Sequence, residues 1–345
     1  MSKRIICMIL TLILAVGILA SCTGSTPAEK ETVYALVTKS AGNPYNEKEA
    51  EGFTEVMKAA GAKYVVQHPE SATVEAQIAV INSLISQGVS SIAVAANDAN
   101  ALSSVLAEAK KAGIKVLTLD SDVNPADRLT FCNQAGVQQV AQALIDAVYD
   151  IAGGEGEYAI LSATSQATNQ NAWIDAMKAI AAADSKYSKL TLVEVAYGDD
   201  ENQKSTDQTQ ALLSKYPDLK VICAPTTVGI AAAAKVLQDK KSTVKLTGLG
   251  LPSEMAAYIG DDADHSCPYM FLWNPIDLGR LAAHASIALV KGDIDGTIGG
   301  TFTAGNMENS PYTLTAVEGT NYSEIILGQP FRFDGANIAE WAQVY

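Results

Sequence analysis

The sequence predicts an α/β protein made of two Rossmann-like lobes, each built on a parallel sheet. Short apolar runs alternate with helical segments from residue 33 to about residue 291, which is the pattern of parallel strands joined by right-handed crossovers. The pattern starts again at residue 138, which indicates a second unit of the same design. The length of 345 residues is comfortable for two domains.

The first lobe is predicted from short apolar runs and from the glycines that follow the helical segments. Gly61, Gly88 and Gly113 each come directly after such a segment, at the position where helices commonly end. A further extended run, residues 129–132, is expected to lead toward the second lobe. The predicted strands cover residues 33–38, 63–67, 91–95 and 116–119, and the predicted helices cover residues 47–60, 71–87 and 97–112.

The second lobe is predicted from the same alternation. A polar loop is expected at residues 163–171, between the first strand of this lobe and the helix that follows it. The predicted strands cover residues 157–162, 190–196, 221–224 and 245–250, and the predicted helices cover residues 138–151, 172–182, 202–215 and 229–238.

The chain is expected to pass between the two lobes three times. A strand at residues 269–273 is stopped by Asn274 and Pro275, and a helix at residues 276–291 is expected to pack back on the first lobe. The crossings would lie near residues 133–135, 273–274 and 299–303, and together they would form a hinge. We therefore predict a first lobe of residues 33–133 plus 274–302 and a second lobe of residues 134–273 plus 303–345.

The N-terminus has the features of an export signal. Lys3 and Arg4 form a basic start, residues 5–20 are apolar, and the run ends in Leu-Ala-Ser before Cys22. This order resembles the bacterial lipoprotein signal, in which the cysteine is lipidated and becomes the first mature residue. The alternative is a transmembrane anchor, for which the apolar run is short. We expect a signal peptide of residues 1–21 and a flexible tether of residues 22–32, which would hold the protein at the extracellular face of the cell membrane through a lipid on Cys22.

Charge and the scarcity of metal-binding side chains argue against several classes of function. The formal net charge of −14 argues against nucleic acid as a partner, because phosphate binding needs a basic face. After Cys22 the chain has only Cys132, Cys223 and Cys267, whose spacing matches no zinc pattern, and its three His are scattered singly. We therefore expect no metal, no cofactor and no His-based catalytic centre, and we expect Cys132 and Cys223 to be buried.

Polar side chains gather where the predicted strands end, at the edge where ligands sit in open α/β sheets. Asp120 is the strongest candidate, because a carboxylate there can accept two hydrogen bonds from neighbouring hydroxyls and so hold a polyol. Asp122 is expected to cap the following turn. Each of these residues, taken alone, is more often a helix cap or a solvated loop residue, and it is their joint position at the carboxyl edge of two sheets that indicates a site. The set consists of Lys39, Asn97, Asp120, Asn169, Gln170 and Thr227.

From residue 33 onward the chain resembles a type I periplasmic sugar-binding protein of the ribose-binding class, the receptor of an ABC importer. It is most similar to the branch that holds autoinducer-2 receptors and rhamnose-binding proteins. The resemblance is carried by the loop at Lys39 and by the segments TLDSD at 118–122, NQ at 133–134, TNQNAW at 168–173, AP at 224–225 and LWN at 272–274.

The resemblance implies a monomeric receptor that binds autoinducer-2, a cyclic tetrahydroxy furanose, in the cleft between the lobes. It also implies an ABC permease in the membrane as the partner. Carried over by position, the ligand contacts would come from Lys39, Asp120, Asn169, Gln170, Pro225 and Thr227, and the further candidates are Asn97, Trp273 and Asn274.

Four residues depart from the family pattern and bear on the identity of the ligand. The family commonly has Asp where Asn169 stands, Ala where Thr227 stands, Asp where Asn274 stands, and a second aromatic residue where Asn46 stands. An Asn still accepts and donates hydrogen bonds, so a hydroxyl partner is kept while one charge is lost. Thr227 narrows the pocket and adds a hydroxyl group.

Other functions remain open on the same residues. The scaffold could bind rhamnose or another pentose or methyl-pentose, or it could serve as a sensory receptor without transport. A glycosidase would need two carboxylates at a set separation, and Asp120 and Asp122 would point to opposite faces of an extended chain. We therefore expect no enzymatic activity.

Overall fold

The computed structural model describes residues 31–345, of which Val33–Tyr345 form one unit. The predicted signal peptide, the predicted lipidation site Cys22 and all but the last two residues of the predicted tether lie outside the described residues. None of the helices in the described part is long and apolar enough to cross a membrane.

The first lobe is built on a seven-stranded sheet with the order β13-β14-β5-β4-β3-β1-β2. Neighbouring strands are parallel except β13 and β14, which pair antiparallel. Six of these strands therefore direct their carboxyl ends to one edge, which places the ends of β1 and β4 near each other. The strands are β1 (Val33–Val37), β2 (Lys63–Gln67), β3 (Ser91–Val94), β4 (Lys115–Leu119), β5 (Phe131–Ala135), β13 (Thr315–Ala316) and β14 (Ser323–Gly328).

Helices cover both faces of this sheet, because its strands are apolar on both sides. On β1, Tyr34 and Leu36 pack in the hydrophobic cluster that contains α2 (Pro44–Ala59) and α10 (Pro275–Lys291). Ala35 and Val37 point the other way, into the cluster formed with α3 (Val74–Gln87) and α4 (Ser103–Lys111). As predicted, the helix that follows residue 274 packs back on the first lobe.

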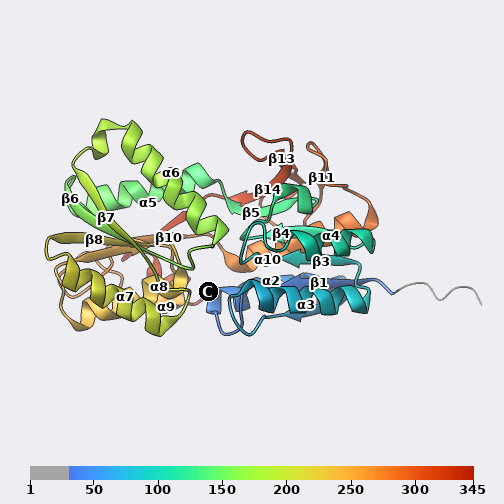
Figure 1. Cartoon of the computed structure of the whole chain (residues 1–345), viewed down its shortest axis with the longest axis horizontal. Coiled ribbons are helices and arrows are strands. Elements are labelled where there is room, and N and C mark those ends of the chain that lie inside the picture. Colours follow the sequence, from blue (N-terminus) through green and yellow to red (C-terminus); the bar gives the residue numbers. More distant parts are fainter. Residues whose placement is uncertain (1–30) are drawn as a thin grey trace, which may run out of the picture. The chain divides into compact units, whose positions relative to one another are not determined.

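The second lobe has a four-stranded parallel sheet with the order β7-β6-β8-β9. A bridge between Leu249 and Phe271 links its β9 edge to β10, which pairs antiparallel with β15. Figure 1 shows α5 and α6 on one side of this sheet and α7 and α8 on the other. The strands are β6 (Gly156–Ser162), β7 (Leu190–Tyr197), β8 (Leu219–Ala224), β9 (Lys245–Gly248), β10 (Tyr269–Leu272) and β15 (Phe331–Asp334). The helices are α5 (Val137–Ala152), α6 (Thr168–Ala183), α7 (Asn202–Lys215), α8 (Thr227–Asp239), α9 (Pro252–Met255) and α11 (Ile338–Trp341).

The C-terminal segment differs from the prediction, which assigned residues 303–345 to the second lobe. β14 pairs with β5 of the first sheet, with Ile325 opposite Cys132, and β15 pairs with β10 of the second lobe. The third crossing therefore lies between β14 and β15, about 25 residues after the predicted position. The physical reason is that β5 offers an unpaired edge, which the apolar β14 covers. A small hairpin of β11 (Thr301–Phe302) and β12 (Tyr312–Thr313) precedes this return.

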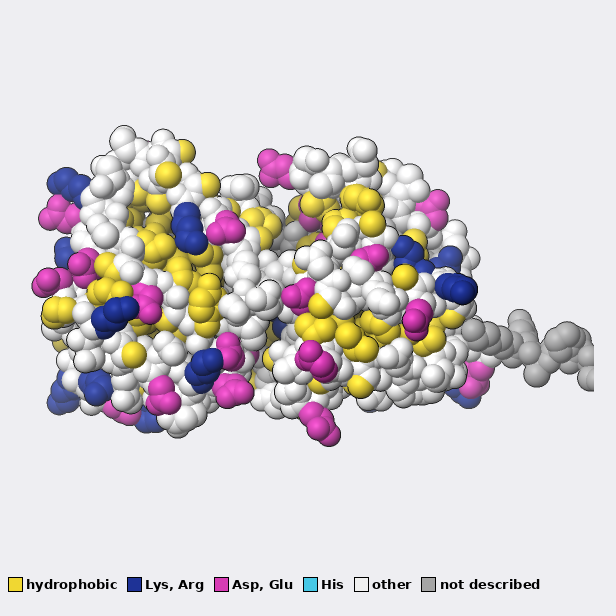
Figure 2. Space-filling model, in the orientation of Figure 1, with side chains coloured by type: hydrophobic (Ala, Val, Ile, Leu, Met, Phe, Trp, Pro, Cys, Tyr) yellow, Lys and Arg dark blue, Asp and Glu magenta, His cyan; other side chains and the backbone are white. Residues whose placement is uncertain are grey.

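The cysteines of the described residues are buried, and the visible surface carries charges of both signs. Cys132 and Cys223 are buried, as predicted, and so is Cys267. Burial raises the pKa of Cys132 and of Cys223 to about 12, so these thiols stay protonated and act as small apolar groups. Figure 2 shows the Lys and Arg side chains of the visible face scattered among Asp and Glu.

Candidate ligand site

A cavity of about 40 Å³ lies where strand ends and helix starts of the two lobes face each other. Seven of the nine predicted ligand residues line it: Lys39, Asp120, Asn169, Gln170, Pro225, Thr227 and Trp273. Eight further residues complete the lining: Asn43, Tyr45, Asn46, Trp173, Asp200, Thr226, Leu249 and Leu272.

Lys39, Asp120 and Asn169 form a bonded set that spans the two lobes. Lys39 follows β1 and Asp120 follows β4, and the Lys39 ammonium stands 3.3 Å from the Asp120 carboxylate. Asn169 belongs to the first turn of α6, in the second lobe. Its Oδ1 accepts a hydrogen bond of 3.1 Å from Lys39, and its Nδ2 donates to Asp120 at 3.3 Å. These buried groups supply both donors and acceptors, which is what a ligand rich in hydroxyls requires.

The backbone at Asp120 has a left-handed conformation, with φ of 57°. This conformation is uncommon for residues other than glycine, although Asp tolerates it better than most. The Asp120 N–H donates to the carbonyl of Cys132, and the next N–H, of Ser121, donates back to the carbonyl of Leu119. The tight turn ends β4 and leaves the Asp120 carboxylate on the lining of the cavity.

Tyr45 and two tryptophans form the aromatic part of the cavity. The Tyr45 hydroxyl donates to Asp120 at 3.2 Å and accepts from the Trp273 indole N–H at 2.6 Å. Burial, followed by the charge of Asp120, raises the pKa of Tyr45 well above its usual range, so the hydroxyl keeps its proton and remains a donor. Trp173 on α6 packs 5.7 Å from Trp273, between ring centroids. Aromatic side chains commonly line the pockets that bind small ligands.

Asp200 is a second carboxylate of the cavity, contributed by the loop after β7. Its carboxylate accepts a hydrogen bond from the Thr226 hydroxyl, and its backbone has a φ of 54°. Burial raises the pKa of Asp200, and the positive charge of Lys39 opposes that shift. Asp200 was not among the predicted site residues, although it follows the predicted strand at residues 190–196 and the rule for strand ends therefore applies to it.

Two predicted ligand residues lie outside the cavity lining, and each has a structural partner instead. The Asn97 side chain donates to the carbonyl of Lys39 at 3.0 Å, so it holds the loop that presents Lys39. Asn274 is the N-cap of α10, where its Oδ1 accepts hydrogen bonds from the N–H groups of Ile276 and Asp277. The reason is local, because Pro275 begins the helix and the residue before it is then the natural cap. In this structure each of the two residues therefore has a positioning role, and contact of either with a ligand stays a prediction.

Asp122 serves the turn that follows β4, as predicted. Its carboxylate pairs with the buried Arg128 at 2.6 Å and accepts hydrogen bonds from the Thr118 hydroxyl and the Val123 N–H. Arg128 also donates to the carbonyl of Ser323, which ties this turn to the start of β14. Asp120 and Asp122 therefore have separate roles, one at the cavity and one in the fold.

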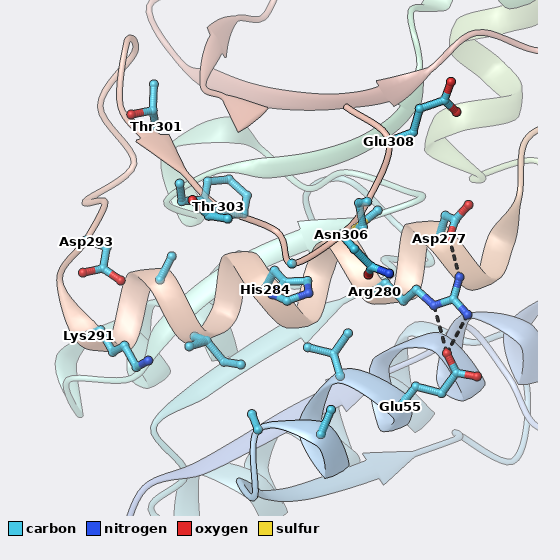
Figure 3. Close-up of a pocket in the computed structure, with 18 residues that line it drawn as sticks. Glu55, Asp277, Arg280, His284, Lys291, Asp293, Thr301, Thr303, Asn306 and Glu308 are labelled. Carbon is cyan, nitrogen blue, oxygen red and sulfur yellow. Dashed lines mark hydrogen bonds and ion pairs between the residues drawn. The ribbon is translucent and has the colours of Figure 1, made fainter. Parts of the chain in front are cut away.

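A larger groove, of about 1040 Å³, lies on the first lobe between α2, α10 and residues 301–308. In it Arg280 bridges Glu55 and Asp277 at 2.7 Å and 2.6 Å, as Figure 3 shows. Lys291 and Glu308 of its lining are exposed, and all of its lining comes from one lobe. No group of three or more metal-ligating side chains occurs here or elsewhere in the described part of the chain. The smaller cavity, with its convergent buried polar groups, is the better candidate for a ligand site.

Comparison with known proteins identifies the family. The profile described as "Periplasmic binding protein domain" matches residues 34–294. The chain belongs to this family. A solved ABC transporter solute-binding protein from Clostridium phytofermentas, with bound L-rhamnose, is 61% identical over 91% of this chain and 99% of that one, with a TM-score of 0.89. The predicted type I periplasmic binding protein fold, with two lobes and parallel sheets, is confirmed.

A more distant solved structure has the same fold, and two further proteins are similar in sequence. LsrB from Clostridium saccharobutylicum, in complex with AI-2, is 21% identical over 90% of this chain and 99% of that one, with a TM-score of 0.82. The D-xylose-binding periplasmic protein of Escherichia coli is 33% identical over 105 residues, and the match spans about a third of its length. The D-apiose import binding protein of Paraburkholderia graminis is 24% identical over 68% of this chain and 74% of that protein.

Proposed function

We propose that this periplasmic binding protein is the receptor of a sugar ABC importer and that its ligand is a 6-deoxy hexose such as L-rhamnose. The observation that carries the proposal is the buried set of Lys39, Asp120 and Asn169, which joins the two lobes around one cavity. The choice of sugar is supported by the relative with bound L-rhamnose, which is 61% identical. Autoinducer-2, which the sequence resemblance placed first, becomes the second candidate, since the relative bound to AI-2 is only 21% identical.

The lining supplies the chemistry that this class of sugar needs. Asp120 accepts hydrogen bonds from two neighbouring hydroxyls, and Lys39 donates to a ring or hydroxyl oxygen. Asn169 does both, from the opposite lobe. Leu249 and Leu272 are almost fully buried and have no polar atom in their side chains, so they suit the methyl group that distinguishes a deoxy sugar.

Anchoring and transport belong to the same proposal. We infer that Cys22 carries lipid and holds the receptor at the extracellular face of the membrane, next to an ABC permease. The N-terminal sequence supports this inference, because a basic start and an apolar run precede Leu-Ala-Ser-Cys22. A monomer that delivers its sugar to the permease is expected, and no enzymatic step is required.

Calorimetry with L-rhamnose and autoinducer-2, side by side on the purified protein, tests the ligand. We expect saturable heat with L-rhamnose and much weaker binding of autoinducer-2. L-mannose is the matched control, because it differs from L-rhamnose by a hydroxyl in place of the methyl hydrogen, and a buried hydroxyl beside Leu249 and Leu272 lacks a partner. L-rhamnose at about 100 times its Kd should also stabilise the folded protein by about 2.7 kcal/mol. Tight autoinducer-2 binding with no response to L-rhamnose would reverse the choice of ligand.

Ligand binding should also change the separation of the lobes. The cavity of about 40 Å³ has little more than the roughly 30 Å³ share of one liquid water, whereas ligand pockets commonly measure about 300–1,000 Å³. To admit a sugar, the free protein must populate an open form in which the bonds from Asn169 to Lys39 and Asp120 are broken. A sugar that contacts both lobes then favours the closed form. Small-angle scattering should therefore give a larger radius of gyration without L-rhamnose than at saturation. Equal radii in the two states would argue against closure by the ligand.

A further inference from the structure

Glu49 is a carboxyl group buried beneath the ligand site. It lies on α2, one turn after Tyr45, and its side chain is inaccessible to solvent. Neither carboxyl oxygen has a hydrogen-bond partner within the described part of the chain. A buried polar group without a partner is costly, so such a group in a native protein calls for an explanation.

The charges that face Glu49 come from the ligand site. Burial raises the pKa of Glu49 most, and the negative charge of Asp120 raises it further, while the positive charge of Lys39 lowers it. The net result is a pKa well above the usual range of a carboxyl group. Tyr45, on the same helix, is the third titratable group that senses Glu49. On the adjacent helix α10, Arg280 pairs both with Asp277 and with Glu55 of α2, in the larger groove described above (Figure 3).

We propose that Glu49 is a positioning residue of the ligand site, whose proton keeps Lys39 and Asp120 available to the sugar. While Glu49 is neutral, Lys39 bonds only Asp120 and Asn169 across the cavity. Once ionised, Glu49 would compete with Asp120 and the ligand for the Lys39 ammonium and would repel the Asp120 carboxylate. Sugar affinity then falls as pH rises through the titration of Glu49. This role rests on the proposed function, because it concerns the same site.

The folded protein holds the Glu49 proton more tightly than the unfolded chain does, so the sign of the pH effect follows. Stability contributed by neutral Glu49 is complete below the ordinary value of 4.5 and is lost as pH rises toward the raised pKa of the folded state. Glu49→Gln imitates the neutral acid at every pH and removes this dependence. The stability difference between Glu49→Gln and the parent should therefore grow with pH.

Thermal unfolding without ligand, at a series of pH values from 5 to 9, tests the neutral state of Glu49. We expect the melting temperature of Glu49→Gln to rise progressively relative to the parent across this range. Glu51→Gln is the control, because Glu51 is an exposed residue of the same helix and its variant should follow the parent. Glu49→Leu is a second variant that has no polar atom to bury, and it should show the same trend. Parallel curves for the parent and both Glu49 variants would overturn the proposal.

Calorimetry with L-rhamnose over the same pH series tests the effect on the site. The parent should lose affinity by up to about tenfold per pH unit once Glu49 ionises, whereas Glu49→Gln should keep its neutral-pH affinity. Tight binding with the same pH profile in the parent and in Glu49→Gln would overturn the role of Glu49 and leave the proposed function intact. No binding of L-rhamnose by the parent at any pH would instead overturn the proposed function, while the unfolding series would still decide whether Glu49 is neutral.

Discussion

Replacing Asp120 by alanine is expected to weaken sugar binding about 100-fold or more. The Asp120 carboxylate already accepts hydrogen bonds from Tyr45 and Asn169, and in the complex it would accept them from two sugar hydroxyls. Charge-assisted hydrogen bonds of this kind contribute roughly 1.5–3 kcal/mol each. A loss of about 1.4 kcal/mol lowers the affinity tenfold, so losing two such bonds lowers it about 100-fold or more. Calorimetry with L-rhamnose measures the loss directly. If Asp120→Ala bound sugar as tightly as the parent, the site would be misplaced.

Two further variants separate binding from folding. Asp120→Asn keeps the size of the side chain, so unlike the alanine variant it leaves no cavity beside Lys39. Weaker sugar binding by Asp120→Asn would therefore reflect the lost negative charge. Asp122→Ala is the matched control two residues away, because Asp122 pairs with buried Arg128 and does not line the cavity. Breaking that pair leaves a buried guanidinium without its carboxylate, which should cost about 3–5 kcal/mol of stability. We therefore expect Asp120→Ala to bind sugar more weakly and Asp122→Ala to melt at a lower temperature.

The alternation of strands and helices was predictable because both faces of each sheet are buried, which makes the strands apolar and the helices amphipathic. β2 and α7 have the predicted bounds. Helix starts were harder. α6 was predicted to start four residues after its actual first residue, Thr168, because Ala167 at the N-cap makes no capping hydrogen bond. Thr226 at the N-cap of α8 likewise makes none with its side chain, since its hydroxyl donates to Asp200. Sequence rules for helix starts rely on such caps.

The pairing of β14 with β5 could not be predicted from local sequence. The two strands are nearly 200 residues apart along the chain, and nothing near Ile325 indicates which sheet it joins. The strands of this region are short, and the turns between them are rich in Gly and Asn, which predicts loops and not a lobe assignment. The choice of sheet is made by tertiary packing against an available edge.

The candidate site was partly predictable, because chemistry at strand ends follows a rule and chemistry on a helix face does not. Lys39 and Asp120 come directly after strands, so the rule for α/β sheets found them. Tyr45 and Glu49 lie on α2, in a charge-rich stretch that is typical of a solvent-exposed helix. Glu49 lies where another helix, far along the chain, packs against α2 at very short distance, which local sequence does not reveal.

Because α10 packs so closely against α2, Gly279→Ala is expected to destabilise the folded protein by about 3 kcal/mol or more. A Cβ built on Gly279 of α10 would stand 1.9 Å from the carbonyl oxygen of Glu49, and one built on Gly52 of α2 would stand 1.8 Å from the carbonyl oxygen of Ile276. Both obstacles are backbone atoms, which cannot rotate away as a side chain could. An alanine at either position must therefore push the two helices apart.

Thermal unfolding of Gly279→Ala should show a melting temperature lower by about 5 °C or more for a chain of this size, if unfolding is reversible. Gly335→Ala is the control, because no heavy atom lies within 4 Å of a Cβ built there.

The contact between α2 and α10 also supports the ligand site. Tyr45 lies on α2, and Trp273, whose indole N–H donates to the Tyr45 hydroxyl, lies just before α10. Moving the helices apart should break that bond, so Gly279→Ala should weaken L-rhamnose binding even at temperatures where the protein remains folded. A variant that melts with the parent would show that α2 and α10 can separate without cost, and the burial of Glu49 would then need another explanation.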